Sequence, residues 1–81
     1  MLHDAEAEFA RYQFIVYPPS MPGAPWLSVC IGPDGHVLDA EAFSTSEEAN
    51  LVTYRAEAIL FASITRQMQV QRVFAAERAL H

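Results

Sequence analysis

Three short runs in the first half of the chain include aromatic and β-branched residues, most densely in the first. Residues 12–17 read YQFIVY, residues 26–31 read WLSVCI and residues 36–43 read HVLDAEAF. Such residues favour strands, so each run predicts one. Between the second and third runs lies GPDG, whose proline, aspartate and glycine favour a tight turn. We therefore expect the second and third strands to form a hairpin.

The first two runs are separated by PPSMPGAP, residues 18–25. Four prolines exclude a helix or an interior strand, so we interpret this segment as an extended connector. Its two overlapping P-x-x-P spacings, Pro19/Pro22 and Pro22/Pro25, offer an alternative as a polyproline ligand. Such ligands generally need a neighbouring cation, and the nearest is Arg11. The connector is therefore the preferred interpretation.

The last part of the chain, residues 44–81, predicts one long helix. It begins with STSEE, which contains two overlapping capping boxes, Ser44 with Glu47 and Thr45 with Glu48. No glycine or proline follows, and the residues are good helix formers. The alternating sequence QMQVQ at residues 67–71 is typical of a strand, but glutamine and methionine favour a helix there as well.

The predicted fold is therefore α+β: a three-stranded antiparallel sheet followed by one long C-terminal helix, in the order βββα. We assign residues 1–11 to an N-terminal segment, 12–43 to the sheet and 44–81 to the helix, within one domain spanning 1–81. Asp4 is placed to cap a short additional helix in the N-terminal segment, with Leu2, Ala5 and Phe9 on one side.

The hydrophobic positions of the long helix form two rows. At about 100° per residue, one row is expected to face the sheet and comprises Ala49, Val52, Ala56, Ile59, Leu60 and Ile64. A second row, with members seven residues apart, comprises Tyr54, Phe61 and Met68. Toward the C-terminus, Val70, Val73 and Phe74 extend the apolar character. One sheet cannot cover both rows.

The predicted helix is also too long for the sheet to cover all of its hydrophobic residues. A helix from residue 46 to residue 81 would be about 50 Å long, whereas a compact chain of this size is about 30 Å across. Either the helix breaks near residues 65–69 and folds back, or a second copy covers it. Because no glycine or proline interrupts the segment, we expect a homodimer. The predicted dimer interface is Tyr54, Phe61, Met68, Val70, Val73 and Phe74.

The face of the sheet turned away from the helix is a second candidate contact surface. If Leu27, Val29 and Ile31 face the helix, then Trp26 faces outward. Such a patch would hold Tyr17 and Trp26, rimmed by Asp39 and Glu41. Either the N-terminal segment covers this patch, or a protein partner of unknown identity binds there.

Composition narrows the classes of partner. The 81 residues carry a net charge of −5, and all five basic residues are arginines. Between Arg11 and Arg55 there are five acidic residues and no basic one, so this segment would repel a phosphate backbone. We expect no direct binding to nucleic acid. The acidic N-terminus does not resemble a secretory signal, and no apolar run is long enough to cross a membrane, so we expect a cytoplasmic protein.

Candidate catalytic residues are few. Cys30 lies in the middle of a strand, where a small buried hydrophobe is the preferred interpretation over a nucleophile. Asp34, His36 and Asp39 match no metal-ligand spacing, and the capping role explains Glu47 and Glu48. We expect no enzyme, no cofactor and no metal.

The middle of the chain resembles two known families in its spacing. The residues concerned are Trp26, Asp34-Gly35, Phe43, Thr45 and Glu48-Ala49. Similar spacing occurs in phage-integrase arm-binding domains and in the N-terminal part of HicB-type antitoxins. The chain departs from the first by having no basic residue on the sheet, and from the second by lacking an acidic–Leu–Pro–Gly end to a strand. The resemblance implies topology only.

These observations lead to a primary hypothesis and two alternatives. The primary hypothesis is a non-catalytic protein-interaction module that self-associates through its C-terminal helix. The first alternative is a small acidic inhibitor, of the phage anti-defence or antitoxin kind, that blocks the basic site of a nucleic-acid-handling protein. A small-molecule enzyme or binding domain is a third class, for which the chain has little room to build a pocket.

Overall fold

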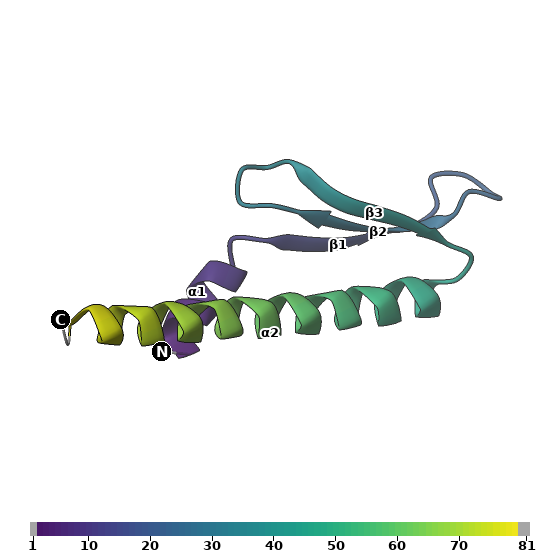
Figure 1. The fold of residues 1–81 in the computed structure, drawn as a ribbon. Helices are drawn as coiled ribbons and strands as arrows, with labels where there is room; N and C mark the ends of the chain where they lie inside the picture. Colours follow the sequence, from purple (N-terminus) through teal and green to yellow (C-terminus); the bar gives the residue numbers. More distant parts are fainter. Residues whose placement is uncertain (1, 80–81) are drawn as a thin grey trace.

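The structure, a computed structural model, describes the backbone of residues 2–79 and the side chains of residues 4–71. Five elements follow one another along the chain: α1 (Leu2–Phe9), β1 (Gln13–Tyr17), β2 (Trp26–Ile31), β3 (Val37–Phe43) and α2 (Ser46–Ala79). The strands form a single sheet that lies over one half of α2, and α1 crosses α2 beside the sheet (Figure 1). The predicted α+β fold with the order βββα is confirmed, together with the short N-terminal helix.

The sheet is an antiparallel meander in the order β1-β2-β3. The turn between β2 and β3 forms as its residue types predict. Gly35 adopts a positive φ of 87°, and its N–H donates to the Gly32 carbonyl at 3.0 Å. The backbone N–H of His36 donates to Asp34 Oδ1 at 3.1 Å, which fixes the turn from within. A register irregularity between Cys30 and Ile31 lies beside this turn.

The connector at residues 18–25 contains one ordered turn. The Ala24 N–H donates to the Met21 carbonyl at 3.1 Å, and Gly23 has a φ of 87°. Proline at the second position and glycine with positive φ at the third are typical of a type II turn. The chain therefore reverses here without a helix or strand, as its composition predicts.

The N-terminus of α2 is capped by Thr45. Its hydroxyl accepts a hydrogen bond from the Glu48 N–H at 3.2 Å and donates to the Glu48 carboxylate at 3.3 Å. The Ala49 N–H donates to the Thr45 carbonyl, which closes the first helical turn. Of the two capping boxes in the sequence, the second therefore starts the helix.

α2 then continues without interruption through residues 65–69, where a break would have folded it back. The QMQVQ segment is helical, although its alternation of polar and apolar residues is typical of a strand. The absence of glycine and proline is sufficient to explain this continuity, because a helix kink needs one of these residues, a bulge or an inserted group.

α1 lies against α2, on the helix side of the sheet, and does not cover the outer face. Phe9 fixes it there by stacking on Phe14 of β1 at 5.9 Å between ring centroids and by an edge contact with Phe61 of α2 at 5.6 Å. Ala5 is buried, which allows the two helices to approach closely. The helix begins at Leu2, so Asp4 lies in its first turn and is not the cap.

A hydrogen-bonded pair identifies the face of the sheet that meets α2. Thr53 is buried, and its hydroxyl donates to the Ala49 carbonyl at 2.7 Å. The same oxygen lies 2.6 Å from Ser28 Oγ, and because the Thr53 proton is already used, Ser28 is the donor. Ser28 therefore faces α2. Side chains alternate along a strand, so Trp26 and Cys30 face α2 as well.

The core beneath this face is small. Within residues 4–71, the buried hydrophobic residues are Ala5, Ala49 and Ile64, and no large side chain is fully buried. The radius of gyration is 16.9 Å, against about 12 Å for a compact chain of this length. The molecule extends 63 Å along its longest axis and only 17 Å along its shortest. One chain therefore encloses little of its hydrophobic surface.

Removal of the α2 cap gives a direct test of the capping geometry. We expect Thr45→Ala to lower the free energy of unfolding by about 1 kcal/mol, because the Glu48 N–H would no longer have its acceptor. Ser44→Ala is the matched control and should change stability by less than about 0.5 kcal/mol. Urea denaturation followed by circular dichroism measures both. Equal destabilisation by the two substitutions would contradict the assignment of Thr45 as the cap.

Candidate interaction surfaces

The four residues predicted to form one outer patch lie on different faces of the sheet. Trp26 is paired with Phe43, Ser28 with Glu41 and Cys30 with Asp39, so Trp26, Glu41 and Asp39 lie on the α2 side. Tyr17 is paired with Leu27 and lies on the opposite side. The assumption that Leu27, Val29 and Ile31 face the helix is therefore wrong, because Ser28, not its neighbours, reaches α2.

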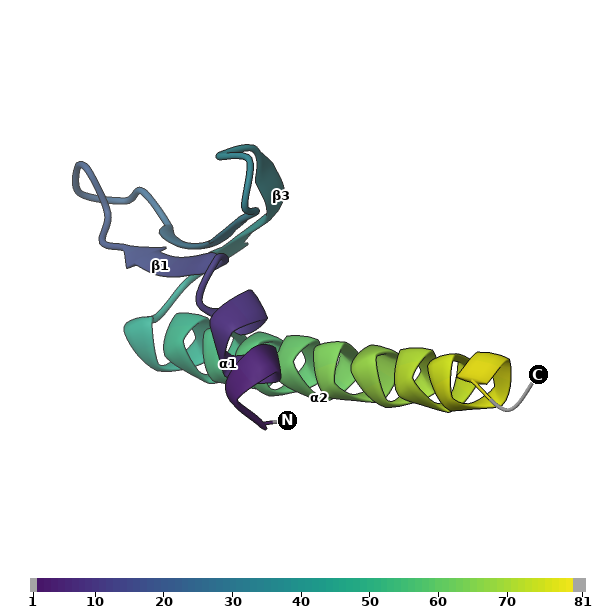
Figure 2. The same cartoon turned by 90° about the vertical axis from the view of Figure 1, so that its left-hand side faces the viewer.

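The face turned away from α2, here called the outer sheet face, is apolar and uncharged. The paired positions place these residues on it: Gln13, Ile15, Tyr17, Leu27, Val29, Ile31, Val37, Ala40 and Ala42. Tyr17 and Val37 at its margins are well exposed. The two views of the ribbon show no described element over this face (Figure 2). It offers a curved surface for apolar contact (Figure 2).

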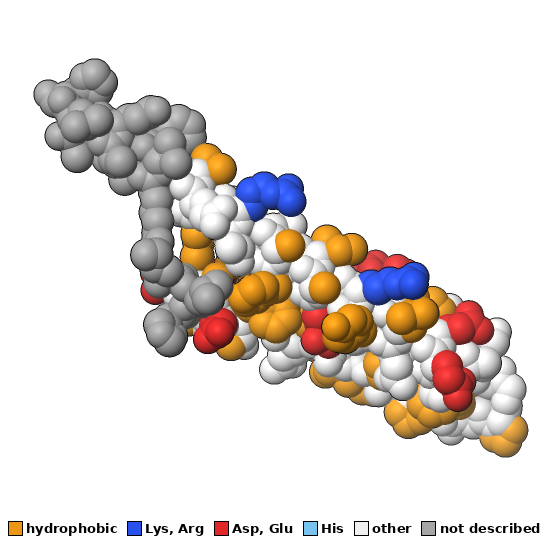
Figure 3. Space-filling view, turned by 90° about the horizontal axis from the view of Figure 1, so that it is seen from below, with side chains coloured by type: hydrophobic (Ala, Val, Ile, Leu, Met, Phe, Trp, Pro, Cys, Tyr) orange, Lys and Arg blue, Asp and Glu red, His pale blue; other side chains and the backbone are white. Residues whose placement is uncertain are grey.

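α2 also presents an open side, turned away from the sheet. Leu51, exposed to 49%, lies there. Other large hydrophobic side chains of α2 are also exposed, to 71% for Tyr54, 68% for Ile59 and 47% for Val70, although Ile59 also lines a groove toward the sheet. Seen from this side, hydrophobic and positively charged side chains alternate along the helix, and acidic side chains lie near its beginning (Figure 3). Burial of one such hydrophobic side chain stabilises by about 1.5–3 kcal/mol, so this surface favours contact.

The structure separates the residues predicted as the dimer interface. Tyr54 and Val70 are exposed on α2. Phe61 contacts Phe9, and Met68 lines a hollow with Glu8 and Tyr12, so α1 partly covers these two. Val73 and Phe74 lie outside the residues whose side chains are described. Ile59, expected to face the sheet, does line a groove between α2 and the sheet, but it stays largely exposed there. Participation in a dimer stays a prediction for all six residues.

A sequence signal for the open side exists outside the two hydrophobic rows. Steps of three, four or seven residues from Glu48 lead along one face, through Leu51, Arg55, Ala58 and Ala62, to Gln69. All six side chains are exposed. Two of them are alanines and two are charged, so a search for large hydrophobic residues alone overlooks this stripe. We call these six residues the open stripe.

A groove of about 310 Å³ lies between the sheet and α2. Tyr12, Phe14, Leu38, Ile59 and Leu60 contribute apolar side chains to its lining, and Cys30 and Asp39 add a thiol and a carboxylate. Burial raises the pKa of the Cys30 thiol, and the negative charge of Asp39 raises it further. A raised pKa leaves less thiolate at neutral pH, which disfavours Cys30 as a nucleophile.

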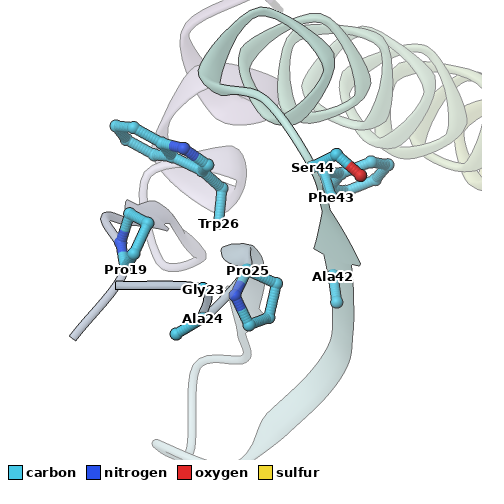
Figure 4. A pocket seen from close by; sticks show the side chains of 8 residues that line it. All are labelled: Pro19, Gly23, Ala24, Pro25, Trp26, Ala42, Phe43 and Ser44. Carbon is cyan, nitrogen blue, oxygen red and sulfur yellow. The ribbon is translucent and has the colours of Figure 1, made fainter. Parts of the chain in front are cut away.

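A second hollow, of about 490 Å³, lies where the connector meets the ends of β2 and β3. Its lining residues are Pro19, Gly23, Ala24, Pro25, Trp26, Ala42, Phe43 and Ser44, none of which is charged. Trp26 and Phe43 project toward the side on which α2 passes, and Ala42 projects away from it (Figure 4). With one indole N–H and one hydroxyl as its only polar side-chain groups, this lining supplies no acid or base for catalysis.

Asp34 and His36, in the turn between β2 and β3, contact each other. His36 Nδ1 lies 2.7 Å from Asp34 Oδ2, and hydrogen bonds from the His36 ring and backbone lower the pKa of the Asp34 carboxyl. Both side chains are exposed. Within the described part of the chain, no three His, Cys, Asp or Glu residues gather as a metal site would require. No helix among the described residues has the length and hydrophobicity to span a membrane.

No known protein family, curated protein or solved structure matches this chain.

The groove yields a test of the Cys30 environment. We expect iodoacetamide at pH 8 to alkylate the folded chain severalfold more slowly than the urea-unfolded chain, because a raised pKa lowers the thiolate fraction. Asp39→Asn should recover part of the rate, since burial is the larger cause and remains. Equal rates for the folded and unfolded chains would contradict this description of the thiol. Mass spectrometry follows both reactions.

Proposed function

We propose that this protein is a non-catalytic protein-interaction module that self-associates through α2. The observation that carries the proposal is the exposure of Leu51, Tyr54, Ile59 and Val70 along a helix that continues past the sheet. Monomeric proteins rarely leave so long an apolar surface in contact with water. A second copy would remove it from water.

The total accessible surface supports the same proposal. It amounts to 6157 Å², whereas a compact monomer of 9.0 kDa would expose about 4,850 Å². The excess of about 1,300 Å² exceeds the roughly 800 Å² that each partner contributes to a standard stable interface. The surface that one chain leaves exposed is therefore large enough to form a stable interface with a second copy.

A second candidate function, the small acidic inhibitor, is favoured by the exposure of all five acidic residues between Arg11 and Arg55. These are Asp34, Asp39, Glu41, Glu47 and Glu48. Such an inhibitor would bind a basic surface of another protein, and its affinity would fall steeply with ionic strength. Association of copies through apolar surface would change little with salt, which separates the two functions.

A matched pair of substitutions tests which open surface mediates self-association. Ala62→Glu places a carboxylate on the open stripe, and Ala40→Glu places one at the centre of the outer sheet face. We expect Ala62→Glu to raise the dimer dissociation constant at least about tenfold, because the carboxylate must either be buried without a partner or force the two helices apart. Ala40→Glu should leave it within about twofold. Sedimentation equilibrium at micromolar concentrations measures both.

The outcomes are distinguishable. Far-UV circular dichroism should show unchanged helicity in both variants, since both side chains are exposed. If Ala40→Glu alone raised the dissociation constant, the dimer interface would lie on the outer sheet face and not on α2. A wild-type protein that sediments as a monomer at micromolar concentrations would remove the proposal.

A further inference from the structure

The open stripe carries charges of opposite sign at separate places along α2. Glu48 stands near the beginning of the helix, and Arg55 lies two turns further on. Arg66 flanks the stripe beyond the two alanines. Neither arginine makes an ion pair with another described residue, and the structure leaves both guanidinium groups exposed. The stripe therefore has charge available for a partner.

The order of these charges discriminates between the two ways in which a copy could pack. Parallel helices in register place Glu48 against Glu48, Arg55 against Arg55 and Arg66 against Arg66, which is repulsive at every point. Antiparallel helices bring the beginning of one stripe to the end of the other. With the two-fold axis between residues 56 and 57, Glu48 of one copy lies level with residues 65–66 of the other, next to Arg66.

We propose that a second copy of this chain packs its open stripe antiparallel against the first, centred between residues 56 and 57. The inference rests on the proposed self-association through α2 and specifies its orientation and register. At this register Leu51 of one copy lies level with Ala62 of the other, so a large side chain meets a small one. Arg55 lies level with Ala58, so the two Arg55 residues of the dimer stand about 4.5 Å apart along the axis. Their long stems cover apolar surface, and their guanidinium groups must diverge into solvent at the rim, whereas both copies of the Glu48–Arg66 pair are attractive.

The rest of the fold is compatible with this arrangement. Ala49 and Thr53 mark the side of α2 that meets the sheet, and helical spacing puts the open stripe on the opposite side. The sheet covers one side of α2 (Figure 2), so the two sheets would become the outer layers of a dimer. Both copies would use the same surface, related by a two-fold axis. Such an interface leaves no free copy of that surface, so assembly stops at the dimer. The outer sheet faces stay accessible, one on each side.

Disulfide crosslinking tests the orientation. The experiment uses a Cys30→Ala background, so that the introduced thiols are the only ones, since the chain has one cysteine. We expect the double variant Leu51→Cys/Ala62→Cys to form a covalent dimer under mild oxidation. Each single variant should stay uncrosslinked, because in the antiparallel register identical positions are separated by about 16 Å along the axis, beyond disulfide reach. Non-reducing electrophoresis measures the product.

The other outcomes are separable. Efficient crosslinking of Leu51→Cys alone would show a parallel pair and overturn the orientation while sustaining self-association. A dimer in sedimentation that none of the variants crosslinks would place the interface away from the open stripe. A monomer in sedimentation would remove both this inference and the proposed function.

Charge reversal gives an independent measurement of the register. We expect Glu48→Arg and Arg66→Glu each to raise the dissociation constant about tenfold, since each creates two like-charged contacts per dimer. The double variant should return it to near the wild-type value. Removal of the capping carboxylate at Glu48 cannot explain such a rescue, because Arg66→Glu restores no cap. Singles that bind as tightly as the wild type, or a double variant that fails to recover, would overturn the register.

Discussion

The attachment of a three-stranded sheet to one narrow stripe of a much longer helix determines the rest of this structure. Ala49 and Thr53 bring α2 close to the sheet, and the Ser28–Thr53 hydrogen bond fixes which face of β2 meets it. Phe9 then attaches α1 to the same side of the assembly. The sheet packs on one side of α2 and α1 crosses its flank, so the side of the helix opposite the sheet and the far face of the sheet remain open (Figure 2). The two candidate interaction surfaces are consequences of this single-sided arrangement.

Local chemistry made most of the fold predictable. GPDG dictates its turn because Gly35 accepts a positive φ and Asp34 bonds the backbone. The STSEE segment defines a helix start, and the absence of glycine and proline keeps α2 continuous past residues 65–69. Each of these features depends on neighbours in the sequence, where residue types determine the geometry directly. The element order followed from them.

The faces of the sheet were not predictable in the same way. Both sets of alternating residues in β2 are largely apolar, so the pattern has no polar side to identify the solvent. Ser28 is polar and would be expected to face water, yet Thr53 provides a partner for it beneath the sheet. The assignment of Trp26 to an outer patch failed for this reason. Likewise, the spacing of Phe61 and Met68 predicts a hydrophobic row that the sheet does not cover. In the structure α1 lies beside both residues. The position of α1 depends on the long-range packing of Phe9, which the sequence pattern does not reveal.

The central claim is that one chain does not enclose enough hydrophobic surface and that a second copy completes it. The most direct measurement is the thermal midpoint of unfolding as a function of protein concentration, together with the mass in solution. Folding of a dimer is coupled to association. A hundredfold increase in protein concentration should therefore add about 2.7 kcal/mol to the apparent free energy of unfolding per dimer and raise the midpoint by several degrees. A midpoint independent of concentration, with a mass of 9.0 kDa throughout, would contradict the claim.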